Sequence, residues 1–320
     1  MKANLLNEYQ AVRENGGGFY EQKRGLIEVS GAEAEMFLNG LITNDVKKLA
    51  ENSSMLAAFP NAQGRLLAVV RVWRKNGKFY FDTEEKTHET VLKNLQRFTL
   101  AGNFFVNDLS DKFAFFSIRG KRILNSKFQI PNSRNETIET EFKSEKITVL
   151  NNSNLGENEF YFYVPKTQAE NFKKELQKAG FAAISDQTFE ILRIEAGLPL
   201  YGIDVDETTI VPEIGLTELI SYNKGCYIGQ EIIARIHFRG HVAKKLTGLV
   251  FENEIVEINP GDELKSMEGK NAGRVTSVTF SPKLSGKIAL AYVRYDYLAE
   301  GTEVKIKDFT AHVKDLPFVR

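Results

Sequence analysis

The sequence has a single cysteine, Cys226, and its formal net charge is zero. One cysteine excludes an internal disulfide and a metal cage built from the cysteines of one chain, although it could supply one ligand to a metal shared with another chain. The 42 basic residues balance the 42 acidic ones. This balance argues against nonspecific electrostatic binding of nucleic acid by the whole protein, although a local basic patch remains compatible with a net charge of zero. We therefore expect no direct nucleic-acid partner.

Long apolar runs and targeting segments are also missing. The longest apolar runs are only a few residues, as at residues 288–293, so we expect no membrane span and no membrane partner. Residues 1–15 are polar and mixed in charge. They lack the apolar core of a signal peptide and the Arg-rich, acid-poor character of a transit peptide. These features favour a cytoplasmic protein in a reducing environment.

The composition that is present is typical of a globular protein. Apolar residues make up 42% and charged residues 26% of the 320 positions. This length predicts two or three domains. From about Val242 the pattern changes to short alternating strands separated by Pro/Gly turns, which indicates a small β-barrel. We place a boundary near residue 240, between an α+β region (1–240) and a barrel domain (241–320), whose expected strands are 246–251, 273–280, 287–293 and 303–306.

The first region mixes helices with antiparallel strands. Ser30, with Glu33 three residues on, has the spacing of a capping box and predicts a helix start. Asn76-Gly77 predicts a tight turn within a meander, and residues 16–18 predict a flexible glycine loop. The other expected elements are strands at 25–29, 55–59, 65–73, 78–82, 113–118 and 160–164, helices at 84–98 and 167–179, and loops with short strands over 125–157.

Residues 224–231, Lys-Gly-Cys-Tyr-Ile-Gly-Gln-Glu, surround the cysteine. The apolar spacing in residues 228–236 predicts a short helix, so Cys226 would lie at a glycine-bent helix entry, close to Lys224. A helix N-terminus and a neighbouring cation both favour the thiolate. The alternative is a small buried hydrophobe, because free cysteine is among the most buried residue types. The lysine and the paired glycines favour the reactive interpretation.

Glu195 lies near the end of a helix that Asp186 is expected to cap and that stops at residues 197–199. A carboxylate at a helix C-terminus is disfavoured by the helix dipole and needs a partner. It could be a surface glutamate paired with a lysine, or a carboxylate that grips two donors on a heterocycle. The residues alone leave both interpretations open.

Several motifs together resemble the YgfZ family, folate-binding relatives of the glycine-cleavage T-protein. The resemblance covers about residues 22–298, and residues 224–231 are its most specific part. The other motifs are Val29-Ser30-Gly31, Phe37-Leu38-Asn39-Gly40, Thr43-Asn44-Asp45-Val46, Gln63-Gly64-Arg65, Arg193-Ile194-Glu195-Ala196-Gly197-Leu198-Pro199, Asp204, Pro212-Glu213, Gly273-Arg274-Val275 and Ala289-Leu290-Ala291.

The resemblance implies an α+β fold: a T-protein-like ring of three lobes, with two intertwined lobes around a central folate-binding funnel and a C-terminal barrel. It implies that tetrahydrofolate is the cofactor, that Glu195 binds the pterin edge and that Phe189 stacks near the folate. One carboxylate matched to two pterin donors would form a selective, charge-assisted pair. The resemblance also implies a role in assembly or repair of iron-sulfur clusters in client proteins, including enzymes that thiolate tRNA. Cys226 and Lys224 are then the expected reactive residues.

One departure bears on the chemistry. The aminomethyltransferases carry a Gly-x-x-Asp-Asp stretch whose aspartate assists transfer, whereas this chain has Leu67 and Ala68 at the acidic positions after Gly64. Without that carboxylate the aminomethyl transfer has no obvious general base. A folate-dependent one-carbon transferase remains the alternative, and it would need a replacement such as Asp45 or Asp204.

A cysteine hydrolase is a third hypothesis, with His237 as base and Glu231 as orienter. His237 lies about three turns along the same expected helix, roughly 16 Å of rise away, which is too far for a hydrogen bond to Cys226. His237 and His241 have the spacing of half a metal site, but we expect Gly240 to end the helix between them and no third ligand is apparent. We therefore expect no metal site.

Overall fold

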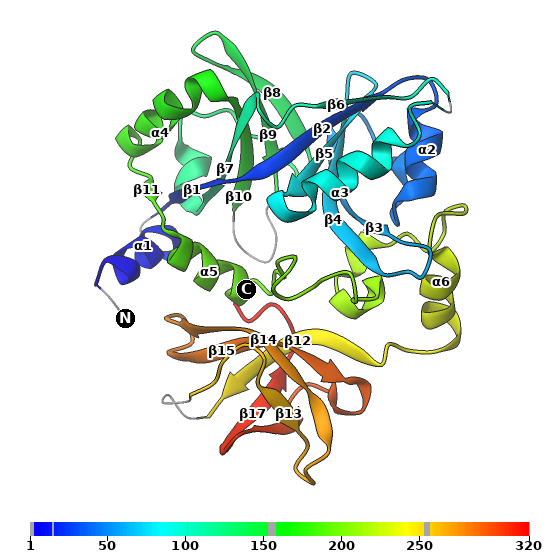
Figure 1. Ribbon diagram of the computed structural model, residues 1–320. Helices are drawn as coiled ribbons and strands as arrows, with labels where there is room; N and C mark the ends of the chain where they lie inside the picture. Colours follow the sequence, from blue (N-terminus) through cyan, green and yellow to red (C-terminus); the bar gives the residue numbers. More distant parts are fainter. Residues whose placement is uncertain (1–2, 15, 101, 153–157, 253–256, 320) are drawn as a thin grey trace. The chain divides into compact units, whose positions relative to one another are not determined.

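The computed structural model describes residues 3–14, 16–100, 102–152, 158–252 and 257–319. The chain forms two compact units, and it passes between them more than once (Figure 1). Unit 1 contains Met1–Asn61, Leu67–Ser185 and Glu218–Ile228; unit 2 contains Ala62–Leu66, Asp186–Thr217 and Gly229–Arg320. The expected boundary near residue 240 stays a prediction, as do the ring and its funnel.

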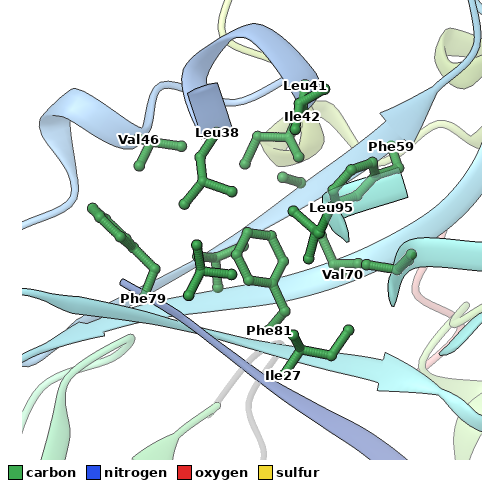
Figure 2. Packing of buried hydrophobic residues seen from close by; sticks show 14 of the residues in the cluster. Ile27, Leu38, Leu41, Ile42, Val46, Phe59, Val70, Phe79, Phe81 and Leu95 are labelled. Carbon is green, nitrogen blue, oxygen red and sulfur yellow. The ribbon is translucent and has the colours of Figure 1, made fainter. Parts of the chain in front are cut away.

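The first sheet of unit 1 is the expected meander with two strands added to it. Its order is β3 (Ser53–Pro60), β4 (Leu66–Lys75), β5 (Lys78–Glu84), β2 (Arg24–Ser30) and β6 (Phe105–Asp108). Asn76 and Gly77 both have positive φ, 51° and 69°, as a two-residue hairpin turn requires. Helices α2 (Ala34–Leu41) and α3 (Glu85–Gln96) contribute Leu38 and Leu95 to the core over this sheet (Figure 2).

The capping interpretation of Ser30 is wrong. Helix α2 begins at Ala34 with Glu33 as its N-cap residue, and Glu33 makes no side-chain cap hydrogen bond. Its carboxylate instead accepts the backbone N–H of Asn103 at 2.5 Å. A partner seventy residues away along the chain has replaced the local one.

The second sheet of unit 1 has six strands. Their order is β11 (Ala182–Ala183), β1 (Gly18–Gln22), β7 (Phe113–Arg119), β10 (Glu159–Pro165), β9 (Glu145–Asn151) and β8 (Thr137–Phe142). Strands β8 and β9 confirm the short strands expected over 125–157, of which 153–157 lie outside the described residues. Gly18 was expected in a loop but begins β1, where a Cβ would lie 2.7 Å from Val12. Helix α1 (Ala3–Arg13), which supplies Val12, was not predicted.

Aromatic packing fills both cores of unit 1. Phe172, on α4 (Ala169–Lys178), is fully buried against Phe116 and Phe162 of the six-stranded sheet. A further cluster joins strands of the two sheets, with Trp73 of β4 and Tyr163 of β10 at a ring-centroid distance of 4.8 Å. The connecting segments of unit 1 are therefore supported by two densely packed sheets.

Unit 2 contains a closed six-stranded barrel, which confirms the expected barrel. Its order is β12 (Lys244–Phe251), β15 (Gly286–Arg294), β14 (Asn271–Ser281), β13 (Glu263–Lys265), β16 (Glu303–Ile306) and β17 (Phe309–Lys314). Strands β13 and β17 were not predicted. Unit 2 also contains the helices α5 (Asp186–Glu195) and α6 (Gln230–Arg239). Over the described residues, the 3-10 helices are η1 (Val46–Lys48), η2 (Lys121–Asn125), η3 (Lys166–Gln168), η4 (Val211–Ile214), η5 (Thr217–Leu219) and η6 (Tyr295–Tyr297). No helix in the described ranges is long and apolar enough to cross a membrane.

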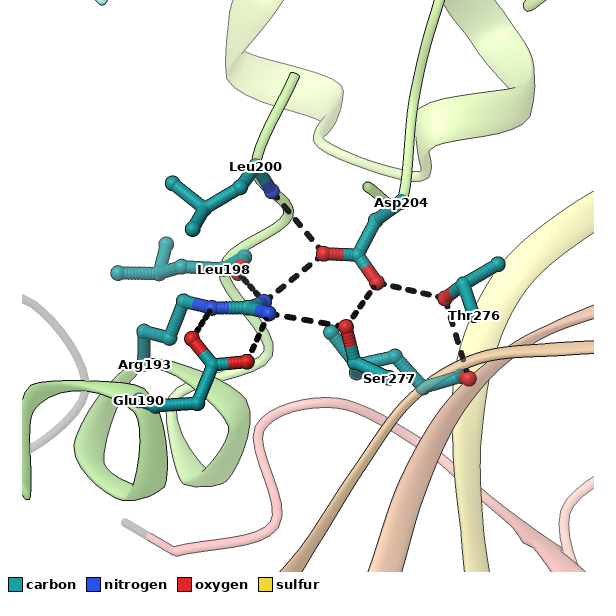
Figure 3. Close-up of polar contacts among 8 residues, drawn as sticks. Glu190, Arg193, Leu198, Leu200, Asp204, Thr276 and Ser277 are labelled. Atoms are coloured by element: carbon teal, nitrogen blue, oxygen red, sulfur yellow. Dashed lines mark hydrogen bonds and ion pairs between the residues drawn. The ribbon is translucent and has the colours of Figure 1, made fainter. Parts of the chain in front are cut away.

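Arg193 joins α5 to the barrel wall (Figure 3). Its guanidinium donates to the Glu190 carboxylate, to the Leu198 carbonyl (3.0 Å), to Asp204 Oδ2 (2.8 Å) and to Ser277 Oγ (2.9 Å). Asp204 also accepts from Thr276 Oγ1 at 2.6 Å and from Ser277 Oγ at 2.7 Å. Arg193 and Asp204 are almost fully buried. All five guanidinium donors thus have partners, which is the condition under which a buried ion pair is tolerated.

We expect Arg193→Met to lower the free energy of unfolding by about 3–5 kcal/mol, because it leaves the Asp204 carboxylate buried without its cation. Urea denaturation of the whole chain measures this. Glu190→Gln is the matched control, since its side chain is 38% exposed, and it should cost at most about 1 kcal/mol. Equal losses in the two variants would contradict a special role for the buried pair.

Candidate functional site

The segment that carries the cysteine is hydrogen-bonded to the turn that follows α2. Both segments belong to unit 1. The Thr43 hydroxyl donates to the Leu219 carbonyl at 2.5 Å, and the Thr43 carbonyl accepts from the Ser221 N–H at 3.0 Å. Two further bonds run from Asn44 Nδ2 to the Glu218 carbonyl (2.9 Å) and from the Ile228 N–H to the Gly40 carbonyl (3.0 Å). Thr43 and Asn44 of the Thr43-Asn44-Asp45 motif therefore bind the cysteine segment directly.

Lys224 is the central contact between these two segments. Its ammonium donates to the Ile42 carbonyl at 2.8 Å and to the Asn44 carbonyl at 2.6 Å. Its Nζ also lies 5.1 Å from the centroid of the Tyr227 ring, within the range of a cation–π contact. The residue is only 9% exposed. Lys224 thus fastens the cysteine segment to the backbone of residues 42–44.

Burial changes the acid-base behaviour of Lys224. Removal from water lowers its pKa to about 8, the Asp45 carboxylate acts in the opposite direction, and Lys47 lowers the pKa further. At pH 7 the side chain is still mostly protonated, so it donates to the two carbonyls as an ammonium. A buried cation needs such partners, because leaving it unpaired would be costly.

Cys226 is exposed at the surface of unit 1. The alternative of a packed, buried cysteine is therefore wrong. Helix α6 begins at Gln230 with Gly229 as its N-cap, so Cys226 precedes the cap by three residues. The roles of Cys226 and Lys224 in chemistry stay predictions.

Glu195 belongs to unit 2 and is fully buried. Its Oε1 accepts the Ser281 hydroxyl at 2.5 Å, and its backbone carbonyl accepts the N–H groups of Phe318 and Val319. Its burial shows that Glu195 is not a surface glutamate, and the expectation that this carboxylate needs a partner is confirmed. A pterin bound by Glu195 would share the carboxylate with Ser281.

Phe189 is half-buried on the same helix as Glu195. Six residues of α-helix separate the two side chains by about 9 Å along the axis and by about 120° around it. A ligand touching both would have to extend along α5. Two cavities of unit 1, of ≈ 800 and ≈ 690 Å³, are lined by other residues and include none of the four predicted site residues.

The positions of the missing acidic pair are apolar in structure as well as in sequence. Ala68 is fully buried in β4, and Leu67 packs against the same core cluster. Asp204 is unsuited to replace the lost base, because Arg193 and Thr276 already hold its carboxylate. Asp45 accepts the backbone N–H of Lys47 at 3.2 Å. Asp45 is thus the better candidate of the two proposed replacements.

The two histidines of the hydrolase and metal hypotheses have other neighbours. The His237 ring contacts Phe238 at a centroid distance of 4.7 Å, and the His241 ring stacks on Tyr295 at 3.5 Å. Helix α6 ends at Arg239 with Gly240 as its C-cap, as expected. Within the described ranges no cluster of three or more His, Cys, Asp or Glu side chains is placed to hold a metal ion.

The lowered pKa of Lys224 predicts a pH-dependent stability. Between its folded value of about 8 and the ordinary value of 10.5, the unfolded chain holds a proton that the folded chain has released. The free energy of unfolding should therefore rise with pH across this window, by roughly 1–2 kcal/mol after allowance for solvent screening. Chemical denaturation at several pH values checks this.

Lys224→Met should lack this rise, while Lys93→Met, which removes a well-exposed lysine whose partner is Glu89, should keep it. A difference in unfolding free energy between wild type and Lys224→Met that is the same at both ends of the window would refute the assignment.

The chain is similar to known proteins over almost its whole length. Residues 1–224 match the family described as the GCVT N-terminal domain, and residues 244–319 match the glycine cleavage T-protein C-terminal barrel domain. An aminomethyltransferase of Rubrobacter xylanophilus is 30% identical, with 99% of this chain and 87% of the relative covered. A putative chloroplastic transferase of Arabidopsis thaliana is 25% identical over 92% of this chain and 69% of its own length.

A crystal structure of the glycine cleavage system aminomethyltransferase T from Bartonella henselae has the same fold. The TM-score is 0.88 at 22% identity, with 98% of this chain and 89% of that chain covered. The expected T-protein-like fold with a C-terminal barrel is thereby confirmed, while membership of the YgfZ family stays a prediction. The two domain matches and the R. xylanophilus relative together show that the chain belongs to the glycine cleavage T-protein family.

Proposed function

We propose that this protein is a folate-binding accessory protein that supports assembly or repair of iron-sulfur clusters in client enzymes, including tRNA-modifying ones. The observation that carries the proposal is an exposed thiol, Cys226. The segment that bears it is held by hydrogen bonds from the buried Lys224 ammonium to the carbonyls of Ile42 and Asn44. A fixed backbone with an accessible sulfur suits transient contact with a partner, because little chain entropy is lost when the thiol engages. The protein acts in the cytoplasm in this proposal.

The loss of the acidic pair supports this function over group transfer. Leu67 and Ala68 pack into the core of unit 1, so the lost base is replaced by apolar side chains. Folate would then be held without the carboxylate that assists aminomethyl transfer. In this proposal Glu195 holds the pterin edge of tetrahydrofolate, with Phe189 beside it on α5.

A second candidate is a tetrahydrofolate-dependent aminomethyltransferase. The 30% identity to the R. xylanophilus protein of that name favours it. It requires a replacement carboxylate, for which Asp45 is available. Incubation of the purified protein with tetrahydrofolate and an aminomethyl donor separates the two candidates: methylenetetrahydrofolate formed with turnover supports the transferase, and tetrahydrofolate binding without turnover supports the accessory protein.

We expect Cys226→Ala to reduce the activity of iron-sulfur client enzymes in cells that depend on this protein. The variant should fold normally, because the side chain is exposed. Asn223→Ala, an exposed neighbour on the same segment, is the matched control and should leave client activity unchanged. Client activities, the amount of soluble protein and its thermal unfolding are measured together.

Full client activity in cells carrying Cys226→Ala would remove the thiol from the function. A loss that accompanies lower amounts of folded protein would instead assign the cysteine a structural role, which its exposure contradicts. Cys226→Ser tests the chemistry further, since a hydroxyl of similar size is a much weaker nucleophile and metal ligand than a thiolate.

A further inference from the structure

A strongly basic stretch follows the cysteine segment and lies wholly in unit 2. Between Glu231 and Glu252 the chain has no acidic residue, and residues 235–245 carry four Lys or Arg side chains and two histidines. The zero net charge of the protein therefore conceals a local excess of positive charge. Charge concentrated in this way is the electrostatic footprint of an anionic partner.

The second half of α6 exposes this charge together with an aromatic ring. Arg235, Arg239 and Phe238 are exposed, Phe238 at 65%. Neither arginine forms an ion pair with a carboxylate in the part of the chain that the structure describes. Ile233, on the apolar face of α6, is fully buried, and the helix packs against η4. The apolar face is thus used within unit 2, and the basic side faces solvent.

The adjoining ends of β12 and β15 add two opposed cations. Lys244 lies directly opposite Arg294 in the antiparallel register, and its Nζ lies 4.5 Å from the centroid of the Tyr292 ring. The Lys244 charge acts on two carboxyls of unit 2: it helps to lower the pKa of Asp206, after the Thr208 hydroxyl, and it opposes the burial that raises the pKa of Glu213. Arg294 itself forms no ion pair with any described carboxylate.

A second aromatic group lies beside these cations. The Tyr295 N–H donates to the Ala243 carbonyl at 3.0 Å, which fixes the tyrosine next to the start of β12. The rings of His241 and Tyr295 stack at 3.5 Å with an interplanar angle of 11°, and Tyr295 remains 48% exposed. This parallel pair is a preformed flat platform of the kind on which a base can stack.

We propose that the exposed basic and aromatic side chains of α6 (Arg235, Phe238 and Arg239), together with Arg294 and Tyr295 at the end of β15, bind single-stranded nucleic acid. The cations contact the phosphates, and the exposed rings stack against unpaired bases. An acidic peptide would use the charges but not the stacked rings. An anionic membrane would need a broad apolar face to insert, whereas α6 buries Ile233 and offers it the exposed ring of Phe238. The proposal does not depend on the folate or iron-sulfur function.

Fluorescence anisotropy with a labelled oligouridylate of about 12 nucleotides tests the proposal, since single-strand sites span roughly 4–16 nucleotides. The triple variant Arg235→Gln, Arg239→Gln, Arg294→Gln should weaken binding at least about tenfold at low salt. It should also lower the slope of log affinity against log salt by about 2, because each phosphate contact contributes roughly 0.7 on single strands.

The matched control is Lys93→Gln, Lys127→Gln, Lys166→Gln, which removes the same charge from lysines of unit 1 that have carboxylate partners. This control should bind like wild type. Tyr295→Ala should weaken binding at least about fivefold and Tyr295→Phe should restore it, because stacking requires the ring and not the hydroxyl.

Four results would overturn the proposal. These are no binding by wild type at low salt, equal weakening by both triple variants, tighter binding of a polyglutamate peptide than of the oligonucleotide, and tighter binding of phosphatidylglycerol vesicles than of the oligonucleotide. Circular dichroism spectra of all variants establish that each one is folded before its binding is compared.

Discussion

A buried lysine ammonium between two backbone carbonyls holds the site of unit 1 together. Lys224 cannot lie away from water without partners, and the carbonyls of Ile42 and Asn44 supply them. Those carbonyls come from the turn after α2, so the cysteine segment has to align with that turn. Cys226 then emerges at the surface from a backbone that is fixed on its inner side. The hydrogen bonds of Lys224 thus fix the backbone that bears Cys226 and leave its sulfur accessible.

Unit 2 uses a buried cation in a similar way. Arg193 has a partner for each guanidinium donor, and its bonds connect α5 with Asp204 and with the barrel strand β14. Glu195, two residues later, is bonded to Ser281 at the end of the same strand. Gly197 then ends the helix with φ of 69° where a Cβ would lie 2.8 Å from Leu316. The Arg193 and Glu195 side chains of α5 thus attach this helix to the barrel, and any folate contact is added to that structural role.

Much of the fold could be predicted because its signals are local. The Asn76-Gly77 turn, the amphipathic α3 and α4, and the alternating barrel strands each depend on neighbouring residues. The three-residue β13 and the polar helix α1 carry weak local patterns and were missed. The capping prediction failed because Glu33 has a distant partner, Asn103.

The site could be predicted only in part. The sequence pointed to Cys226 because it is the single cysteine and because a lysine and two glycines stand near it. Its exposure agrees with a reactive role. The partners of Lys224 lie about 180 residues away, and Ser281 lies 86 residues from Glu195. No short-range pattern encodes such contacts. The sequence therefore predicts that Lys224 acts on the thiol. The structure shows that its ammonium donates to the backbone carbonyls of Ile42 and Asn44.

Amide hydrogen exchange tests most directly whether Lys224 fastens the cysteine segment. The Ser221 N–H donates to Thr43 in the turn after α2 and the Ile228 N–H donates to Gly40 in the last turn of α2, so both report opening of that contact. In Lys224→Met both amides should exchange at least roughly tenfold faster than in wild type, while amides of β15 in the barrel should be unaffected. Unchanged protection of Ser221 and Ile228, or an equal acceleration throughout the barrel, would contradict the account.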